Sequence, residues 1–356
     1  MLSILFFFLI VIFNLPLLFS FLKQKKILLI FFILFFNLLF SQSKPIAFYS
    51  MVKIFQFLFI AYFFYETKID NFLILFSFLL ITLIEFFLAL HQIKSGHSFD
   101  GVFYFLGERH INLAHPSIAK VIFFDQQLLR PYGTFSHPNS LAGFYLLLYT
   151  FILTQKNFDN YQLLKNILLF LSTVLIFLSF SKVVIFVFLL INILFYFKKI
   201  RSCPLCFLTK IITIFTLSFL FLFSKGDLLS LQKRTELIFQ SLRIIGNHPF
   251  FGVGLGNYLF AQKNFSSSFP LFFNQPVHNI FLLFLAEVGI PVFILLIFFA
   301  FIFFKKNFKK ISFATYSLLL ATFLTGFFDH YWLTLKQNFL LTAVIFGLTF
   351  QELKRS

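Results

Sequence analysis

Apolar runs alternate with short polar links along nearly the whole chain. A helix that spans a bilayer needs about 20 apolar residues, and only helices and closed barrels satisfy their backbone groups in lipid. The runs are too long and continuous for barrel strands, so they predict an all-α, polytopic helical membrane protein with about 11 (10–12) transmembrane helices. The predicted spans are 2–22, 27–41, 46–64, 71–90, 138–154, 166–180, 183–197, 211–224, 278–304, 311–328 and 335–350.

The distribution of charge orients these spans. The chain has 29 Lys and Arg against 12 Asp and Glu, a formal net charge of +17. The basic residues form short clusters between apolar runs, as topology signals do, rather than a basic surface with interleaved aromatics. The pattern therefore argues against a nucleic-acid partner and predicts that one set of links is cytoplasmic: 23–26, 66–71, 155–165, 198–210, 305–310 and the tail 353–356.

The opposite side is then extracytoplasmic and carries two long loops, 91–137 and 225–277, within a single membrane domain over residues 1–356. All eight histidines fall on this side, which favours a functional site there, although loops also hold more polar residues in general. They are His91, His97, His110, His115, His137, His248, His278 and His330.

The pattern of residues 231–246 predicts an amphipathic helix within the second loop. Its apolar stripe is Leu231, Thr235, Ile238, Leu242 and Ile245, opposite Gln232, Lys233, Glu236, Gln240 and Arg243. Arg234 falls inside the apolar stripe, where a buried cation needs an anionic partner. That partner is either a lipid headgroup reached by snorkelling or a substrate phosphate held by the planar guanidinium.

Two further features follow in the same loop. The string N-H-P-F-F-G-V-G-L-G-N-Y at 247–258 lacks the signature and setting of a phosphate loop, so it predicts a flexible turn. His278 opens an apolar run and either anchors the interface or acts as a general base. Glu287 lies about 13 Å deeper along a helix, too far to orient His278, and is expected to make a buried polar contact. Glu85 is a second acidic residue inside a span, without an assigned role.

The end of the first loop reads R-P-Y-G-T-F-S-H-P-N-S-L-A-G from Arg130 to Gly143. It predicts turns, with Asn139 or Ser140 capping the next helix and with Arg130 and His137 beside the membrane. Lys182 interrupts a later apolar stretch at the outer surface, where it either snorkels or binds a ligand.

A metal site is not predicted. Cys203 and Cys206 form a C-x-x-C pair without a second pair, and chance is favoured over half a zinc site or a redox pair. The histidine pairs 91/97 and 110/115 lack helical i, i+4 spacing and an acidic cluster.

Together these strings resemble the O-antigen ligase and polymerase superfamily of bacterial membrane glycosyltransferases. The resemblance covers about 125–295, while the first 120 residues match only in being spans. It rests on R-P-Y-G-T-F-S-H-P-N-S-L-A, on S-K at 181–182, on K-R-T-E-L-I-F at 233–239, on N-H-P-F-F-G-V-G-L-G-N-Y, and on H-N-I-F-L-L-F-L-A-E-V-G-I-P at 278–291.

The resemblance implies a metal-independent, inverting glycosyltransferase without a cofactor. It would be a multi-pass protein of the bacterial inner (cytoplasmic) membrane, in contact with membrane lipid, with its active site facing the periplasm. Its donor would be a glycan on undecaprenyl pyrophosphate, and its acceptor the lipid A core or another glycan.

The resemblance also implies roles for residues. Arg234 would hold the pyrophosphate, and His278 would activate the acceptor hydroxyl. Lys182 stands where the family pattern has arginine, so it keeps the charge but loses the bidentate fork. Arg130 is a further candidate for the pyrophosphate. His137, Asn279 and Glu287 would support these residues.

Three alternatives stay open. A ligase and a polymerase of this superfamily differ only in the acceptor. A polysaccharide flippase or other transporter would form no bond and is expected to have charged residues inside several spans, where only Glu85 and Glu287 qualify. A non-catalytic membrane scaffold would leave Arg234 without an anion.

Overall fold

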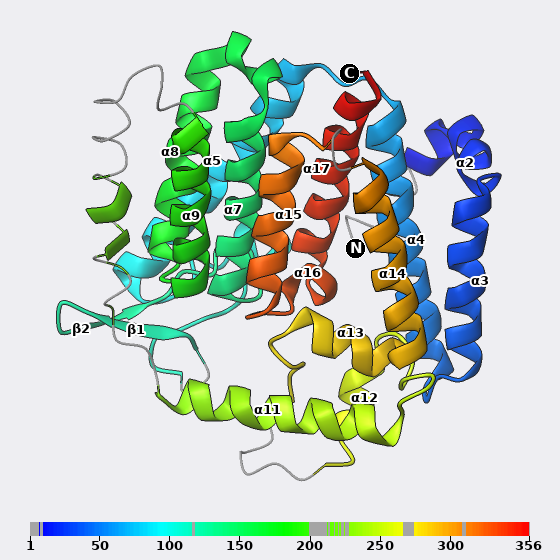
Figure 1. The fold of residues 1–356 in the computed structure, drawn as a ribbon. Helices are drawn as coiled ribbons and strands as arrows, with labels where there is room; N and C mark the ends of the chain where they lie inside the picture. Colours follow the sequence, from blue (N-terminus) through cyan, green and yellow to red (C-terminus); the bar gives the residue numbers. More distant parts are fainter. Residues whose placement is uncertain are drawn as a thin grey trace. The chain divides into compact units, whose positions relative to one another are not determined.

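The computed structural model describes residues 10–115, 118–198, 228–265, 274–307 and 311–355, with residue 7 and isolated positions between 212 and 224 (Figure 1). Over these residues the chain is mostly helical and forms two compact units. Unit 1 comprises Met1–Lys68, Gln232–Ile311 and Ala343–Ser356, and unit 2 comprises Ile69–Leu231 and Ser312–Thr342.

Four helical stretches among the described residues are long and apolar enough to cross a membrane. They are α4 (Lys44–Glu66), α5 (Asn71–Ser95), the stretch Lys156–Leu178 made of η1 (Lys156–Tyr161) and α8 (Gln162–Leu178), and α14 (Ile290–Asn307). Three shorter apolar helices accompany them: α7 (Pro138–Thr154), α9 (Lys182–Lys198) and α15 (Phe313–Gly326). The chain is therefore a helical membrane protein, and the number of about 11 spans stays a prediction.

Two of the expected spans differ from the observed helices. The stretch 278–304 is divided at Gly289 into α13 (Ile280–Val288) and α14. Near the N-terminus, a turn at Asn14 separates α2 (Leu15–Leu22) from the helical residues before it, and a proline stands in the first turn of α2. The expected span 211–224 lies largely outside the described residues, as do Cys203 and Cys206.

Unit 1 packs helices from three separate stretches of the chain. Phe21 of α2 is fully buried against Phe55 and Phe59 of α4, with ring centroids 5.8 and 5.5 Å apart. The helix α3 (Lys25–Leu39) also packs on α4. From the far end of the chain, Gln351 of α17 (Lys336–Arg355) donates hydrogen bonds to three carbonyls at the end of α4, including that of Thr67 at 2.7 Å.

Unit 2 is built around α7, whose residues are buried from Pro138 to Leu153. This helix packs against α8, α9 and α15. Gly143 allows the close approach of Tyr331, from the short helix α16 (Tyr331–Thr334), because a Cβ at this position would collide with the phenol ring. A helix buried on all sides explains why its sequence is apolar throughout rather than striped.

The all-α prediction is wrong in one place, because the first loop contains a β-hairpin. Strands β1 (Lys120–Phe123) and β2 (Gln126–Leu129) pair antiparallel, with Lys120 opposite Leu129. The two turn residues, Phe124 and Asp125, both have positive φ, at 47° and 60°, as two-residue hairpin turns require. The sequence lacks the Asn-Gly or Asp-Gly pair that normally signals such a turn.

Candidate functional site

The glycine string that follows α11 (Leu228–Asn247) is a fixed loop rather than a flexible turn. Gly252, Gly254 and Gly256 all have positive φ, at 65°, 94° and 74°. The N–H groups of Val253 and Gly254 donate to the carbonyls of Ala286 and Glu287 at 3.0 and 2.9 Å. These bonds satisfy carbonyls at the C-terminal end of α13, which a helix leaves without internal partners.

A buried asparagine of α3 holds the same loop. The Oδ1 of Asn37 accepts from the N–H of Leu255 at 2.9 Å, and its Nδ2 donates to the carbonyls of Phe251 and Glu287 at 3.3 and 3.2 Å. The carboxylate of Glu287 accepts hydrogen bonds from the N–H groups of Gly256 and Tyr258. The buried polar contact expected of Glu287 is thus with the glycine loop. Asn37 was missed, although an amide inside an apolar helix is a signal of its own.

His278 directly precedes Asn279, which is the N-terminal cap of α13. The Oδ1 of Asn279 accepts from the N–H groups of Phe281 and Leu282 at 2.9 and 3.0 Å. Such a cap fixes the direction in which the chain enters the helix. His278 is half-buried. It is therefore held at a defined entry point rather than along the side of a long span.

The structure has a helix, α11, over the stretch predicted to be amphipathic, but it buries a different face. The buried residues are Leu237, Gln240, Ser241 and Ile244, whereas Leu231, Ile238 and Leu242 of the predicted apolar stripe are exposed. Gln240 accepts from Nε2 of Gln262, in α12 (Tyr258–Gln262), at 2.7 Å. Arg234 is half-buried, one turn before Leu237.

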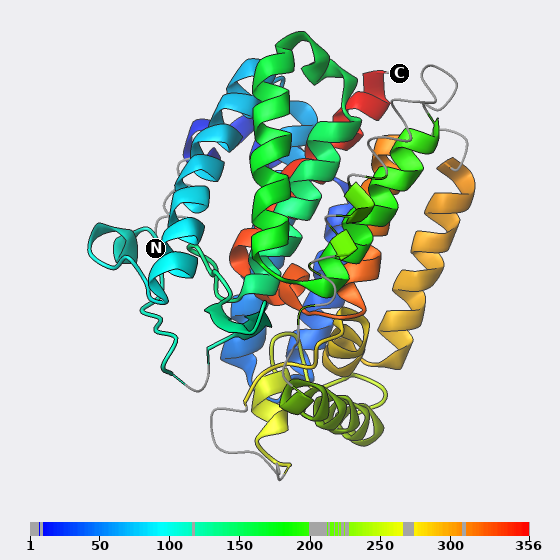
Figure 2. The ribbon, with the colours of Figure 1, turned by 90° about the vertical axis from the view of Figure 1, so that its left-hand side faces the viewer.

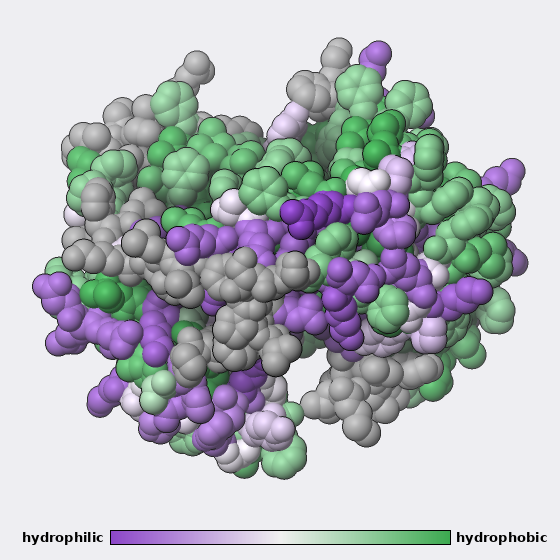
Figure 3. Space-filling view, turned by 90° about the horizontal axis from the view of Figure 1, so that it is seen from below, coloured by the Kyte–Doolittle hydropathy of each residue, from purple (hydrophilic) through white to green (hydrophobic). Residues whose placement is uncertain are grey.

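The apolar stripe of α11 was predicted to lie either on a membrane or on other helices, since hydrophobic periodicity identifies an apolar face but not its neighbour. In a membrane protein that neighbour can be lipid. The face of the structure that carries α11 shows many hydrophilic side chains in purple, with hydrophobic ones in green around them (Figure 3).

In unit 2, Arg130 joins the end of β2 to two helices. Its Nε donates to the carbonyl of Ser179 at 2.8 Å, and its Nη2 donates to Oδ1 of Asn139 at 2.6 Å. Asn139 in turn donates to Oδ2 of Asp329 at 2.8 Å. Asp329, just before α16, is half of the D-H pair that ends an apolar run, and it was missed as a candidate.

His137 rather than Asn139 or Ser140 caps α7, which corrects the expected cap. Its Nδ1 accepts from the N–H of Asn139 at 3.1 Å. This leaves Asn139 to bind Asp329, while Ser140 donates to Oδ1 of Asn338, in α17, at 2.5 Å. The polar residues at the start of α7 therefore position neighbouring elements as well as the helix.

Lys182 is exposed at the first residue of α9, directly after buried Ser181. The positive end of a helix dipole and a lysine at the same place both favour an anion. Ser179, whose carbonyl accepts a hydrogen bond from Arg130, lies in the short turn that directly precedes α9. Unit 2 thus brings Arg130 to the turn that leads into Lys182.

A polar network fixes the first loop to the end of α5. Gln92, fully buried, accepts from the N–H groups of Tyr132 and Gly133 at 2.8 and 2.9 Å. Thr134 hydrogen-bonds through both its N–H and its hydroxyl to the buried carboxylate of Glu85. Glu85 therefore holds the segment that leads to His137.

Two groups in this loop have shifted pKa values. The hydroxyl of Ser98 first, and then the ring of His110, lower the pKa of the Asp100 carboxyl, which they contact at 2.7 and 3.1 Å. Burial raises the pKa of Tyr132, whose hydroxyl accepts from the N–H of Ala119 at 3.0 Å.

The predicted site residues are divided between the units. Arg234, His278, Asn279 and Glu287 belong to unit 1, while Arg130, His137 and Lys182 belong to unit 2. Within unit 1, Asn279 positions His278, and within unit 2 the Arg130–Asn139 contact links the residues around α7.

Comparison with known proteins gives one result. Residues 167–297 match the model of a protein family described as O-Antigen ligase, and the resemblance is therefore confirmed over these residues. Searches of curated proteins and of solved structures find no significant match.

Proposed function

We propose, from the premise that residues 167–297 are matched by the O-Antigen ligase family, that the chain transfers a glycan from undecaprenyl pyrophosphate to an acceptor hydroxyl at the periplasmic face. The proposal rests on three residues that lie within the matched segment. They are Lys182, Arg234 and His278, the cations and the base expected of such a site.

The reaction is an inverting substitution at the anomeric carbon of the donor sugar. The acceptor oxygen forms the new glycosidic bond while the bond from the sugar to the pyrophosphate breaks. The acceptor proton passes to His278, and undecaprenyl pyrophosphate leaves with the electron pair. General-base assistance of this kind contributes about 10²–10⁴-fold in rate.

The leaving group gains negative charge as the bond breaks, so cations that hold it stabilise the transition state. Arg234 supplies a planar guanidinium suited to two phosphate oxygens, and Lys182 supplies a second positive charge. The bonds of Arg130 to Ser179 and Asn139 favour a positioning role for it next to the turn before Lys182.

The test replaces the two main residues in a strain that lacks the native gene. Arg234→Ala and His278→Ala are expected to abolish the surface glycan while the membrane level of the protein stays normal. Arg243→Ala, at an exposed arginine of the same helix, is the matched control and is expected to retain the glycan. Wild-type glycan in either site variant would refute the assignment.

The banding of the surface polysaccharide identifies the acceptor. Loss of all attached glycan in the deletion strain indicates a ligase, as we propose. Survival of single-unit bands indicates a polymerase that uses the same donor.

A further inference from the structure

A group of exposed apolar side chains lies on the first loop, in and around the short helix α6 (Val102–Phe105). We call these residues the aromatic patch: Phe99, Val102, Tyr104, Phe105 and Leu106. Phe105 is 80% exposed and Val102 is 73% exposed. Apolar side chains grouped in this way are typical of a surface that binds lipid or protein.

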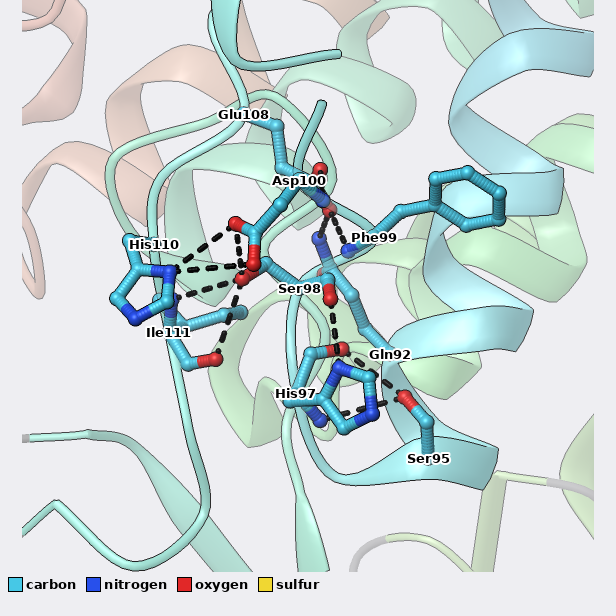
Figure 4. A network of polar contacts seen from close by, with 9 residues as sticks. All are labelled: Gln92, Ser95, His97, Ser98, Phe99, Asp100, Glu108, His110 and Ile111. Atoms are coloured by element: carbon cyan, nitrogen blue, oxygen red, sulfur yellow. Dashed lines mark hydrogen bonds and ion pairs between the residues drawn. The ribbon is translucent and has the colours of Figure 1, made fainter. Parts of the chain in front are cut away.

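The aromatic patch is held in a defined conformation by one carboxylate. Oε1 of the buried Glu108 accepts from the N–H of Phe99 at 2.9 Å, and Oε2 accepts from the N–H of Asp100 at 2.8 Å (Figure 4). Nε2 of Gln92, from α5, donates to the same carboxylate at 2.8 Å. The patch is thereby fixed to the end of α5.

The aromatic patch lies next to the exposed apolar surface of α5. Figure 2 shows α6, the teal helical turn that follows α5, beside the lower part of α5 rather than beyond its end. Exposed Phe87 and, one turn later, His91 lie on one face of α5. The ring of Phe99 lies 4.8 Å from that of His91, and the ring of Phe103 lies 5.1 Å from that of Phe99. The outer apolar surface of α5 therefore continues onto α6.

Polar and apolar side chains are sorted to opposite sides of this loop. The carboxylate of Asp100 turns to the hydroxyl of Ser98 and the ring of His110, at 2.7 and 3.1 Å. Figure 4 shows Phe99 on the opposite side from His110. The exposed side chains of the patch carry no charge with which a polar protein surface could pair.

We propose that the aromatic patch inserts into the interfacial layer of the membrane that α5 crosses, so that its partner is lipid. Tyrosine and other aromatic rings are favoured at this depth, and apolar groups that enter it from a surface loop gain by leaving water. Because Gln92 also binds the backbone of Tyr132 and Gly133, the insertion fixes the height above the bilayer of the segment that carries Arg130.

The test places single nitroxide labels on the full chain, reconstituted into lipid bilayers. The native cysteines are replaced by Cys203→Ser and Cys206→Ser, and labels are attached at Phe105→Cys and Val102→Cys. Both positions are highly exposed, so their substitution removes few protein contacts. Ala114→Cys, at an exposed residue of the same loop, is the control.

Labels at 105 and 102 are expected to be relaxed more strongly by oxygen, which concentrates in lipid, than by a water-soluble nickel complex. The label at 114 is expected to show the reverse order. Strong relaxation by the nickel complex at 105 and 102 would mean that the patch faces water. Weak relaxation by both reagents would mean that protein covers it, and either result overturns the proposal.

Discussion

Single buried amide side chains connect backbone segments that are far apart in the sequence. Asn37 binds the glycine loop in unit 1, and Gln92 binds the segment 132–133 in unit 2. Each amide satisfies backbone groups that would otherwise be buried without a partner, at a cost of about 1–3 kcal/mol per group. These contacts position backbone segments that lead to the candidate site residues.

The lowered pKa of Asp100 predicts an acid-sensitive contact in the first loop. Because the pKa is lower in the folded loop than the unfolded value of about 3.9, the stabilisation is present above that value. It is lost as the pH falls through the folded value. We expect the protection of residues 98–111 in hydrogen exchange, corrected for intrinsic rates, to fall below about pH 4.

Asp100→Asn is the matched control for this effect, since asparagine tolerates the positive φ of 63° at this position. It is expected to show weaker protection at pH 6 and no acid step. Identical profiles for the two proteins would contradict the role of the carboxylate.

At the scale of elements, the break between α13 and α14 depends on one glycine. Gly289 has φ 81° and ψ 166°, a region that is essentially restricted to glycine. A Cβ there would collide with the backbone of Phe250 and Gly252. The N–H of Ile290 donates to the carbonyl of Pro249 at 2.8 Å, so the glycine string and the break stabilise each other.

Gly289→Ala is therefore expected to destabilise unit 1 by about 1–3 kcal/mol or more. Gly246→Ala is the control, because a Cβ there meets nothing within 4 Å and alanine favours a helix by about 0.5–1 kcal/mol. In thermal unfolding in detergent, we expect a lower midpoint temperature for Gly289→Ala than for the native protein. For Gly246→Ala we expect an equal or higher midpoint. Equal midpoints for the two variants would show that the break is not required.

The sequence predicted the long helices well, because an uninterrupted apolar run allows little else in a membrane. It also singled out Arg234, His278, Arg130 and His137, since each stands in a distinctive string, and their roles stay a prediction. It could not predict the break at Gly289, where the backbone conformation is selected by distant residues 249–252. The buried face of α11 was equally hidden, because it includes the polar side chains of Gln240 and Ser241, and Gln240 accepts a hydrogen bond from the distant Gln262.

At the scale of the molecule, α5 separates two links of unit 2 that are predicted to lie on opposite sides of the membrane. One is the link that contains η1, and the other is the first loop. The ring of Phe72, at the start of α5, lies 5.8 Å from that of Tyr161 in η1. The first loop leaves the other end of α5, after 25 residues of helix. At 1.5 Å per residue this is about 37 Å, more than the roughly 30 Å of a hydrocarbon core.

This separation makes the predicted orientation testable by labelling. In the Cys203→Ser, Cys206→Ser background, Ala114→Cys is expected to react with an impermeant maleimide on intact spheroplasts, because the first loop is predicted to be periplasmic. Asn160→Cys, at an exposed residue of η1, is expected to react only after permeabilisation. The opposite result would invert the topology and contradict a periplasmic site.

The bond between Gln351 and the carbonyl of Phe64 spans 287 residues of sequence, and this separation sets an order for biogenesis. Synthesis proceeds at about 5–20 residues per second. The helix α17, which completes the packing of α4, is therefore made roughly 15–60 s after α4. During that time the membrane contains an unfinished unit 1. Membrane chaperones and proteases therefore have a long interval in which to act on it, and slow elongation after residue 68 should lower the yield of folded protein.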